Sequence, residues 1–245
     1  MPHGLVRKAL VCILPTVVAL GVLARLMSDP LDLGYGYLLK VLAVFVAGAA
    51  VVLAGLPRHH PFDSFGVANA VTTARAAVVA LLAGLIGERT NGAAAALAVA
   101  AAVLVTVLDG VDGWLARRTR MASPFGARFD METDAVMILV LAVLAWQFGK
   151  VGAWVVASGV FRYAFVAAGL VWPSLRMPLP PSTRRKAVAI AQVVALIAAL
   201  CPFVPAAAAA ALAAAGLCAL SLSFLQDVRW LLRPTAYSRG GVVSP

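Results

Sequence analysis

The chain is 245 residues long, and its composition argues against an ordinary water-soluble protein. Hydrophobic residues make up 63% of the chain and charged residues 12%, whereas soluble domains contain about 45–50% and about 25%. The formal net charge is +10, but the cations lie at the ends of apolar runs, which is typical of loops beside anionic lipid headgroups and argues against a nucleic-acid-binding protein.

Apolar runs recur along the whole chain at the length that a membrane span requires, which is about 20 residues of helix. The first begins after Arg7 and Lys8, as a signal peptide does, but it is too long for one and no clear cleavage site follows, so we expect it to be retained. The predicted fold is an all-α integral membrane protein with about eight transmembrane helices. The runs lie at 5–27, 37–56, 67–87, 92–112, 130–149, 151–172, 186–202 and 206–232.

The distribution of Lys and Arg predicts the orientation of these helices. With both termini in the cytoplasm, the inside segments carry 14 of the 20 Lys and Arg residues and the outside segments four. This excess follows the positive-inside rule. A composition rich in Ala, with more Arg than Lys, indicates a GC-rich bacterial genome. We therefore predict a multi-pass protein of a bacterial plasma membrane, with the acidic stretch at 109–134 at the cytoplasmic face.

Acidic residues gather where two predicted helices meet. Asp109 and Asp112 are three residues apart, and Asp130 and Asp134 are four apart, so each pair shares one face of its helix. A short turn at about 118–127 makes the two helices antiparallel and brings the pairs together. Four carboxylates at one membrane-embedded point repel one another unless cations neutralise them. Oxygen ligands favour a hard ion, Mg²⁺ or Mn²⁺.

The acidic cluster also fits roles other than metal binding. The acids can form an interfacial salt-bridge cluster with Arg117, Arg118, Arg120 and Arg128. Glu132, two residues from both Asp130 and Asp134, faces elsewhere and is expected to be solvated. A divalent-cation transporter also places acids within helices, but along a path through the membrane, and a non-catalytic scaffold is a further alternative.

The same stretch resembles the signature of the CDP-alcohol phosphotransferase (CDP-alcohol phosphatidyltransferase) family, D-x-x-D-G-x-x-A-R, eight residues, then G-x-x-x-D-x-x-x-D. The resemblance implies a core of six transmembrane helices at 61–234, preceded by two extra helices in 1–60 and followed by a cytoplasmic tail at 235–245; the family commonly forms homodimers. The fixed positions that match are Asp109, Asp112, Gly113, Ala116, Arg117, Gly126, Asp130 and Asp134.

Two further segments are similar to patterns of this family. Asn69, Thr72 and Arg75 match an N-x-x-T-x-x-R pattern in the first core helix, and an arginine inside a span is costly enough to indicate a functional site. Before the fifth core helix, Lys186 and Gln192 fit a G-K-x-K-T-x-x-Q segment of some lipid-forming relatives. The Lys-Thr pair of that segment is missing, which argues against a simple assignment as phosphatidylglycerophosphate synthase.

The resemblance implies transfer of a phosphatidyl group from CDP-diacylglycerol to an alcohol in phospholipid biosynthesis, with release of CMP. Two Mg²⁺ (or Mn²⁺) ions are expected on Asp109, Asp112 and Asp130, with Asp134 close to them as the general base. The CDP surface is expected to comprise Asn69, Thr72, Arg75, Gly113, Ala116, Arg117 and Gly126.

The acceptor is a small alcohol whose identity stays open, and a soluble CDP-alcohol donor acting on a lipid acceptor is the alternative reaction. Basic residues further along are candidates for binding an acceptor phosphate, because arginine binds phosphate in a bidentate manner. The alternative is that they are ordinary cytoplasmic-loop cations and a snorkelling arginine. These residues are Arg162, Arg184, Arg185 and Lys186.

Overall fold

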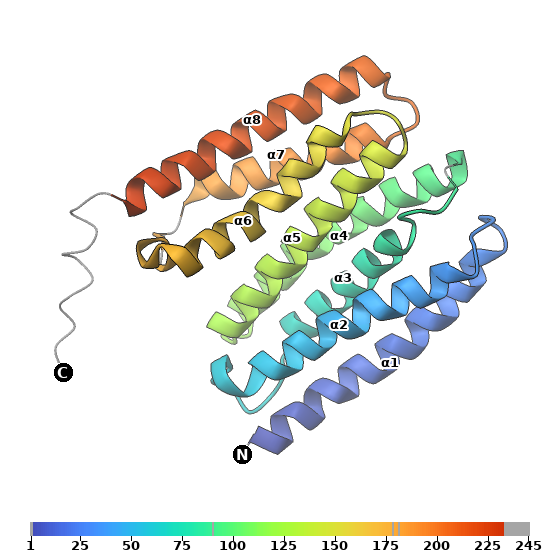
Figure 1. Cartoon of the computed structure of the whole chain (residues 1–245). Helices are drawn as coiled ribbons and strands as arrows, with labels where there is room; N and C mark the ends of the chain where they lie inside the picture. The colour runs from blue at the N-terminus through green and yellow to red at the C-terminus, as the bar shows by residue number, and fades with distance from the viewer. Residues whose placement is uncertain (1, 90, 178, 181, 233–245) are drawn as a thin grey trace.

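The computed structural model describes residues 2–89, 91–177, 179–180 and 182–232. Within these ranges the chain forms eight α-helices and two short 3-10 helices, and no strand, with the long helices running side by side (Figure 1). The α-helices are α1 (Pro2–Ser28), α2 (Gly36–His59), α3 (Val67–Gly84), α4 (Gly92–Arg118), α5 (Pro124–Gln147), α6 (Ala157–Val171), α7 (Thr183–Leu200) and α8 (Ala206–Leu231). The 3-10 helices are η1 (Ala153–Val156) and η2 (Pro173–Arg176).

The predicted all-helical membrane fold is confirmed, and six of the described helical segments are long and apolar enough to cross a membrane. These are α1, α2, α3, α4, α6 with η1, and α8. The other two, α5 and α7, are interrupted by charge: α5 carries the acids from Asp130 to Asp134, and α7 begins with Arg184, Arg185 and Lys186. Both of these helices carry predicted functional residues.

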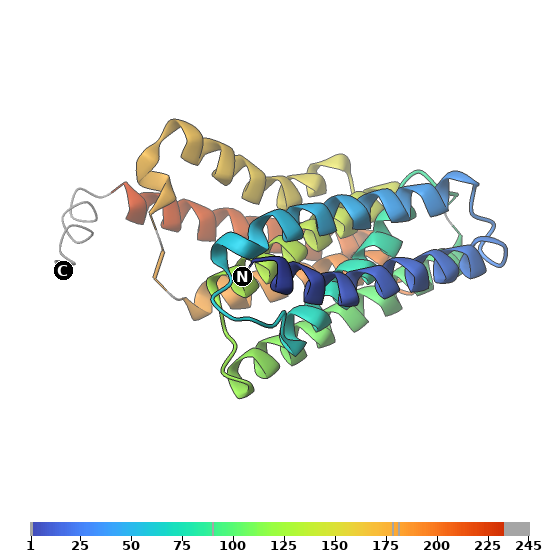
Figure 2. The same cartoon turned by 90° about the horizontal axis from the view of Figure 1, so that it is seen from below.

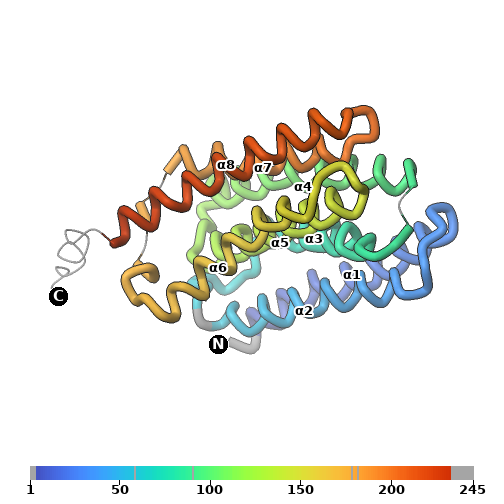
Figure 3. Tube along the Cα trace, turned by 45° about the horizontal axis from the view of Figure 1, so that its top comes forward, coloured from blue at the N-terminus to red at the C-terminus, as the bar shows by residue number. Residues whose placement is uncertain are grey.

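The bundle is ordered around α3. Figure 3 shows α1 and α2 on one side, α7 and α8 on the other, and α3, α4 and α5 between them. Of the apolar stretch in α3, 61% is buried inside the protein, against 11–28% in the other five spans. Side chains on α3 are therefore the most shielded from lipid and water in this bundle, which is the environment in which a charge most needs a partner.

The N-terminal pair packs on α3 along narrow stripes. In α1 the buried positions are Leu5, Ala9, Ile13, Leu20 and Ala24, spaced as one helix face. Figure 2, seen from below, shows α1 and α2 in front of the other helices.

Gly84 lets α2 approach α3 closely. A Cβ atom at this position would lie 2.4 Å from Val41 Cγ2 and 2.7 Å from Tyr37 Cε2. The Tyr37 hydroxyl donates to the Leu81 carbonyl at 3.2 Å. The extra helices are thus fitted to the core by shape and by a buried hydrogen bond.

A polar network fastens the N-terminal pair to the end of the bundle where α3 stops. Lys40 Nζ donates to Glu88 Oε1 at 2.6 Å and to the Ile86 carbonyl at 2.7 Å, and the Gly34 amide donates to Glu88 Oε2 at 2.7 Å. Burial by itself raises the pKa of Glu88, but the hydrogen bonds from Lys40 and Gly34 and the attraction of Lys40 outweigh it. The pKa of Glu88 therefore lies below its ordinary value of 4.5.

Replacing Glu88 by Gln is expected to lower the melting temperature at pH 7 by roughly 2–4 °C, the shift that about 1 kcal/mol produces in a chain of this size. Because the pKa of Glu88 is lowered by folding, the stabilisation is complete above about pH 4.5 and is lost as the pH falls through the folded pKa. Thermal unfolding of the detergent-purified protein between pH 7 and pH 3 measures this, and the two proteins should converge at the acid end. Asp32→Asn, in an exposed pair with Arg89 at 3.6 Å, is the control and should shift nothing; a constant gap between wild type and Glu88→Gln at every pH would contradict the prediction.

Candidate active site

One side chain of α3 forms the centre of the site. Gly66 precedes the helix with a φ of 83°, a left-handed conformation that favours glycine. Along the helix, Asn69, Thr72 and Arg75 follow at steps of three and share one face, and all three are buried. Arg75 is completely buried, with 0% of its surface exposed, so its charge has to be met by other helices.

Two capped helices supply the acids. The Asn91 side chain accepts from the Ala94 amide at the start of α4, and Ser123 accepts from the Gly126 amide at the start of α5, where Pro124 takes the first turn. Both caps satisfy amide groups that a helix start leaves open. The short turn between α4 and α5 makes them antiparallel, so the end of α4 and the start of α5 lie at one level.

All four predicted aspartates converge on Arg75. Its Nη1 atom lies 2.6 Å from Asp112 Oδ2 and 2.5 Å from Asp130 Oδ1. Its Nη2 atom lies 2.6 Å from Asp109 Oδ1 and 2.5 Å from Asp134 Oδ1. The alternative of pairing with Arg117, Arg118, Arg120 or Arg128 is wrong, because the ion pairs of these acids within the described residues all go to Arg75.

The aspartates differ in their surroundings. Asp112 is 4% exposed at its side chain and also accepts from the Thr72 hydroxyl at 2.9 Å. Asp109, Asp130 and Asp134 are about 40% exposed: 39%, 41% and 43%. One acid is therefore held inside the bundle, and the other three are partly accessible from outside it.

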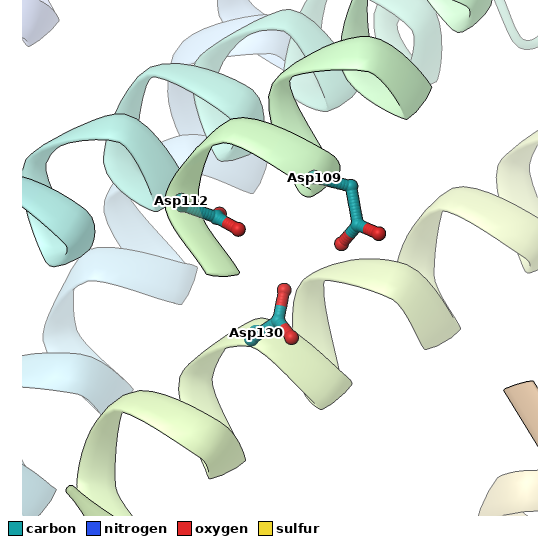
Figure 4. A group of neighbouring side chains, drawn as sticks. All are labelled: Asp109, Asp112 and Asp130. Atoms are coloured by element: carbon teal, nitrogen blue, oxygen red, sulfur yellow. The ribbon is translucent and has the colours of Figure 1, made fainter. Parts of the chain in front are cut away.

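The residues present fit a hard divalent cation. One oxygen each from Asp109, Asp112 and Asp130 lies within 4.8 Å of the other two, and Figure 4 shows these side chains pointing toward one another from α4 and α5. The donors are carboxylate oxygens, which suit Mg²⁺ or Mn²⁺. When all four carboxylates are ionised, they and the one guanidinium carry a net charge of −3, so the cluster attracts further positive charge.

This geometry agrees with the comparison with known protein families. The family model for CDP-alcohol phosphatidyltransferase matches residues 65–223, more than half of the chain and nearly all of the part from α3 onward. The chain belongs to the CDP-alcohol phosphatidyltransferase family. No curated protein and no solved structure gives a significant match.

The small residues of the family signature lie beside the acids. A Cβ atom on Gly126 would come within 3.1 Å of Asn69 Oδ1 and 3.3 Å of Ser123 Oγ, so this glycine makes room for the Asn69 side chain. A Cβ atom on Gly113 would be 3.4 Å from Arg117 Nη1. Ala116 is partly buried, while Arg117 is exposed at the end of α4. Gly113, Ala116 and Arg117 thus follow Asp109 and Asp112 on α4, and Gly126 precedes Asp130 by one turn of α5.

The basic residues predicted to bind an acceptor phosphate are spread over two places. Arg162 Nη2 lies 2.5 Å from Glu132 Oε1, on the face of α5 turned away from Asp130 and Asp134. The expectation that Glu132 is simply solvated was therefore wrong, although it does face elsewhere. The structure leaves Arg162 outside the aspartate cluster.

The other predicted cations lie at the start of α7. Arg184 and Arg185 reach Asp227 Oδ1 on α8 at 2.7 Å and 3.3 Å, and Lys186 is exposed. Asp227, which is 7% exposed, was not among the residues predicted from the sequence. The sequence feature that could have identified Asp227 is its position as a single acid near the end of an otherwise apolar run.

Replacing Arg75 by Gln removes the only cation that contacts the aspartates within the described residues. Breaking a buried ion pair costs about 3–5 kcal/mol, so we expect the melting temperature in EDTA to fall by at least about 6 °C. Added Mn²⁺ should stabilise this variant by more than it stabilises the wild type, because the cluster then lacks its guanidinium.

Thermal unfolding of the purified protein with EDTA and with Mn²⁺ gives both shifts. Arg162→Gln is the matched control, since Arg162 meets one acid and is 25% exposed at its side chain; it should lose less than about 4 °C. An Arg75→Gln variant that melts with the wild type in EDTA would show that the four-carboxylate contact does not stabilise the fold.

Proposed function

We propose that the protein transfers a phosphatidyl group from CDP-diacylglycerol to a small alcohol, with release of CMP, as a step of phospholipid biosynthesis. The observation that carries this proposal is the convergence of four carboxylates from α4 and α5 on a single buried guanidinium from α3. Family membership supports the general phosphotransferase chemistry. The identity of the donor, the identity of the acceptor and the roles of individual residues go beyond the family match and are proposed here.

The charge balance supports two divalent ions. Two such ions would bring four positive charges to a cluster whose net charge is −3, and the small excess suits a donor pyrophosphate. Asp109, Asp112 and Asp130, with Asp134 beside them, would hold the ions, which supply charge neutralisation for the donor pyrophosphate and the departing CMP. Before the ions bind, Arg75 holds the four carboxylates close together.

Asp134 is proposed as the general base. It is the aspartate furthest along α5 and is 43% exposed at its side chain, so an acceptor hydroxyl can approach it. The acceptor oxygen bonds to the phosphorus of the phosphatidyl group while the phosphoanhydride bond to CMP breaks. Asp134 takes the hydroxyl proton, and CMP leaves with the bonding electron pair.

Substrate contacts are proposed on two sides of the acids. Gly113, Ala116, Arg117 and Gly126 are assigned to the CDP moiety. Asn69, Thr72 and Arg75, which were also expected there, are buried and are assigned to positioning the aspartates and the start of α5. For an acceptor phosphate we retain Arg184, Arg185 and Lys186, because they lie together at the start of α7, a helix that packs on both α4 and α5. Arg162 is left out of this assignment because Glu132 meets its single charge, whereas Arg184 and Arg185 share one acid, Asp227, and Lys186 adds a further positive charge beside them.

The Lys and Arg distribution supports a location with both termini and the site at the cytoplasmic side of a bacterial plasma membrane. The start of α1, the turn between α4 and α5, and the end of α8 lie at the same end of the bundle (Figure 1), as this orientation requires. We also propose a homodimer, which rests on the family alone. A transporter is disfavoured because the acids lie at one level and do not follow a path through the bundle.

The reaction is tested by CMP release from CDP-diacylglycerol with Mg²⁺ and a panel of alcohols and alcohol phosphates. Asp134→Asn should lower turnover by about 10²–10⁴-fold, the usual contribution of a general base, while CDP still binds. Glu132→Gln, two residues away on the other face of α5, is the matched control and should stay close to wild type.

The outcomes separate the two donor types and the base assignment. CMP release with a CDP-amino-alcohol and diacylglycerol, but not with CDP-diacylglycerol, would replace the proposed donor by a soluble one. Asp134→Asn with wild-type turnover would remove the base assignment. A chain that releases no CMP with any donor would overturn the proposed function.

Metal dependence is tested by removing divalent ions. EDTA should abolish CMP release, and Mg²⁺ or Mn²⁺ should restore it. Asp130→Asn should weaken Mn²⁺ binding, measured by electron paramagnetic resonance without substrate, because it removes one of the three converging oxygens. Full activity in EDTA would contradict the assignment of a metal cofactor.

A further inference from the structure

A second site lies on the side of α5 that is turned away from Asp130 and Asp134. It is an elongated cavity of about 710 Å³, within the range of about 300–1,000 Å³ that ligand sites occupy. α2 supplies one wall, α5 the other, and α3 the floor, helices that lie next to one another in Figure 3. None of the four aspartates lines it.

The walls of the cavity are mostly apolar, and most of their polar groups are already paired within the protein. Two hydroxyls face the cavity from the helices, but Thr73 donates to the Asn69 carbonyl at 2.8 Å and Thr133 to the Phe129 carbonyl at 2.9 Å. Glu132 also lines it, but its charge is met by Arg162. The interior therefore offers little to a polar ligand and suits a hydrocarbon chain.

The length of the cavity matches one leaflet of a bilayer. Its lining runs along α5 from Pro124 to Val136, which is about 18 Å of helix. One leaflet contributes about 15 Å of hydrocarbon. The cavity begins at the level where α5 begins, so a chain inserted from this end would lie parallel to the helices, as lipid tails do.

The mouth of the cavity is basic. Arg128 and His59 line it at the end where α5 starts and α2 stops, and both are exposed. Among the described residues Arg128 has no carboxylate partner within ion-pair distance. A cation at the membrane surface attracts an anionic headgroup.

We propose that this cavity, the α2–α5 groove, holds one acyl chain of an anionic phospholipid whose headgroup phosphate contacts Arg128. The lipid is a resident one, separate from the substrates, because none of the four aspartates lines the groove. On α5 the lining residues Arg128, Glu132 and Val136 lie on the face turned away from Asp130 and Asp134. The groove exists only where α2 stands beside the core, and this gives the extra N-terminal helices a function: they complete a lipid site. The proposal does not depend on the phosphatidyl-transfer reaction.

Gly48 provides a sharp test, because a Cβ atom there would meet nothing within 4 Å and its side chain would enter the groove. Gly48→Leu fills the groove and also favours the helix. Gly36→Leu, on the same helix, outside the groove and equally open, is the matched control. Arg128→Gln removes the headgroup contact at an exposed position, where surface substitutions usually change stability by less than about 0.5 kcal/mol.

The measurement is native mass spectrometry of the full chain, released from nanodiscs that contain equal phosphatidylglycerol and phosphatidylcholine. Wild type and Gly36→Leu should retain one phospholipid per chain, with a phosphatidylglycerol preference of about fivefold, the ratio expected for one cation near an anionic headgroup. The amount of phospholipid retained per chain should be at least tenfold lower in Gly48→Leu than in the wild type. Arg128→Gln should keep the lipid and bring the preference close to one.

Three results would overturn the proposal. Equal lipid retention by Gly48→Leu and wild type would show that no chain lies in the groove. A shift of Gly48→Leu from dimer to monomer, with the bound lipid unchanged, would assign the groove to a second copy of the chain. Displacement of the bound phosphatidylglycerol by added CDP-diacylglycerol would assign it to the donor's own tail.

Discussion

The contact of one guanidinium with four carboxylates constrains the rest of this structure. Arg75 carries one positive charge with no exposed surface, and without it the aspartates would repel one another inside a low-dielectric bundle. The contact requires that α3 be central, that α4 and α5 be antiparallel, and that their ends lie level. The caps at Asn91 and Ser123 and the short α4–α5 turn meet these requirements. The same cluster remains three charges short of neutrality, so the element that stabilises the fold also creates the demand for metal.

Much of this could be predicted from the sequence, because it depends on spacing alone. Apolar runs of span length predicted the eight helices, and steps of three and four placed Asp109 with Asp112 and Asp130 with Asp134. The cost of burying an arginine marked Arg75 as functional. Each of these inferences uses the period of a single helix or the length of a single turn. Such local properties do not depend on how the neighbouring helices pack.

What could not be predicted depends on how each helix is rotated against its neighbours. The sequence assigned Arg75 to the CDP surface, and only the packing of α3 between α4 and α5 shows it in contact with all four aspartates. In the same way, periodicity says that Glu132 faces away from Asp130 but not that Arg162 meets it. The α2–α5 groove is a property of four helices together, α1, α2, α3 and α5, and leaves no pattern in any one of them.

The two N-terminal helices matter to the site even though the family match begins at residue 65. They cover the face of α3 opposite Arg75, and Gly84 and Tyr37 bring α2 into close contact there. Because Arg75 fixes four carboxylates on one face of α3, contacts of α1 and α2 on the opposite face help to keep α3 in position. A membrane leaves such a face to lipid unless protein covers it. α1 and α2 both pack on α3, and the α2–α5 groove is the gap in this packing that the proposed lipid would fill.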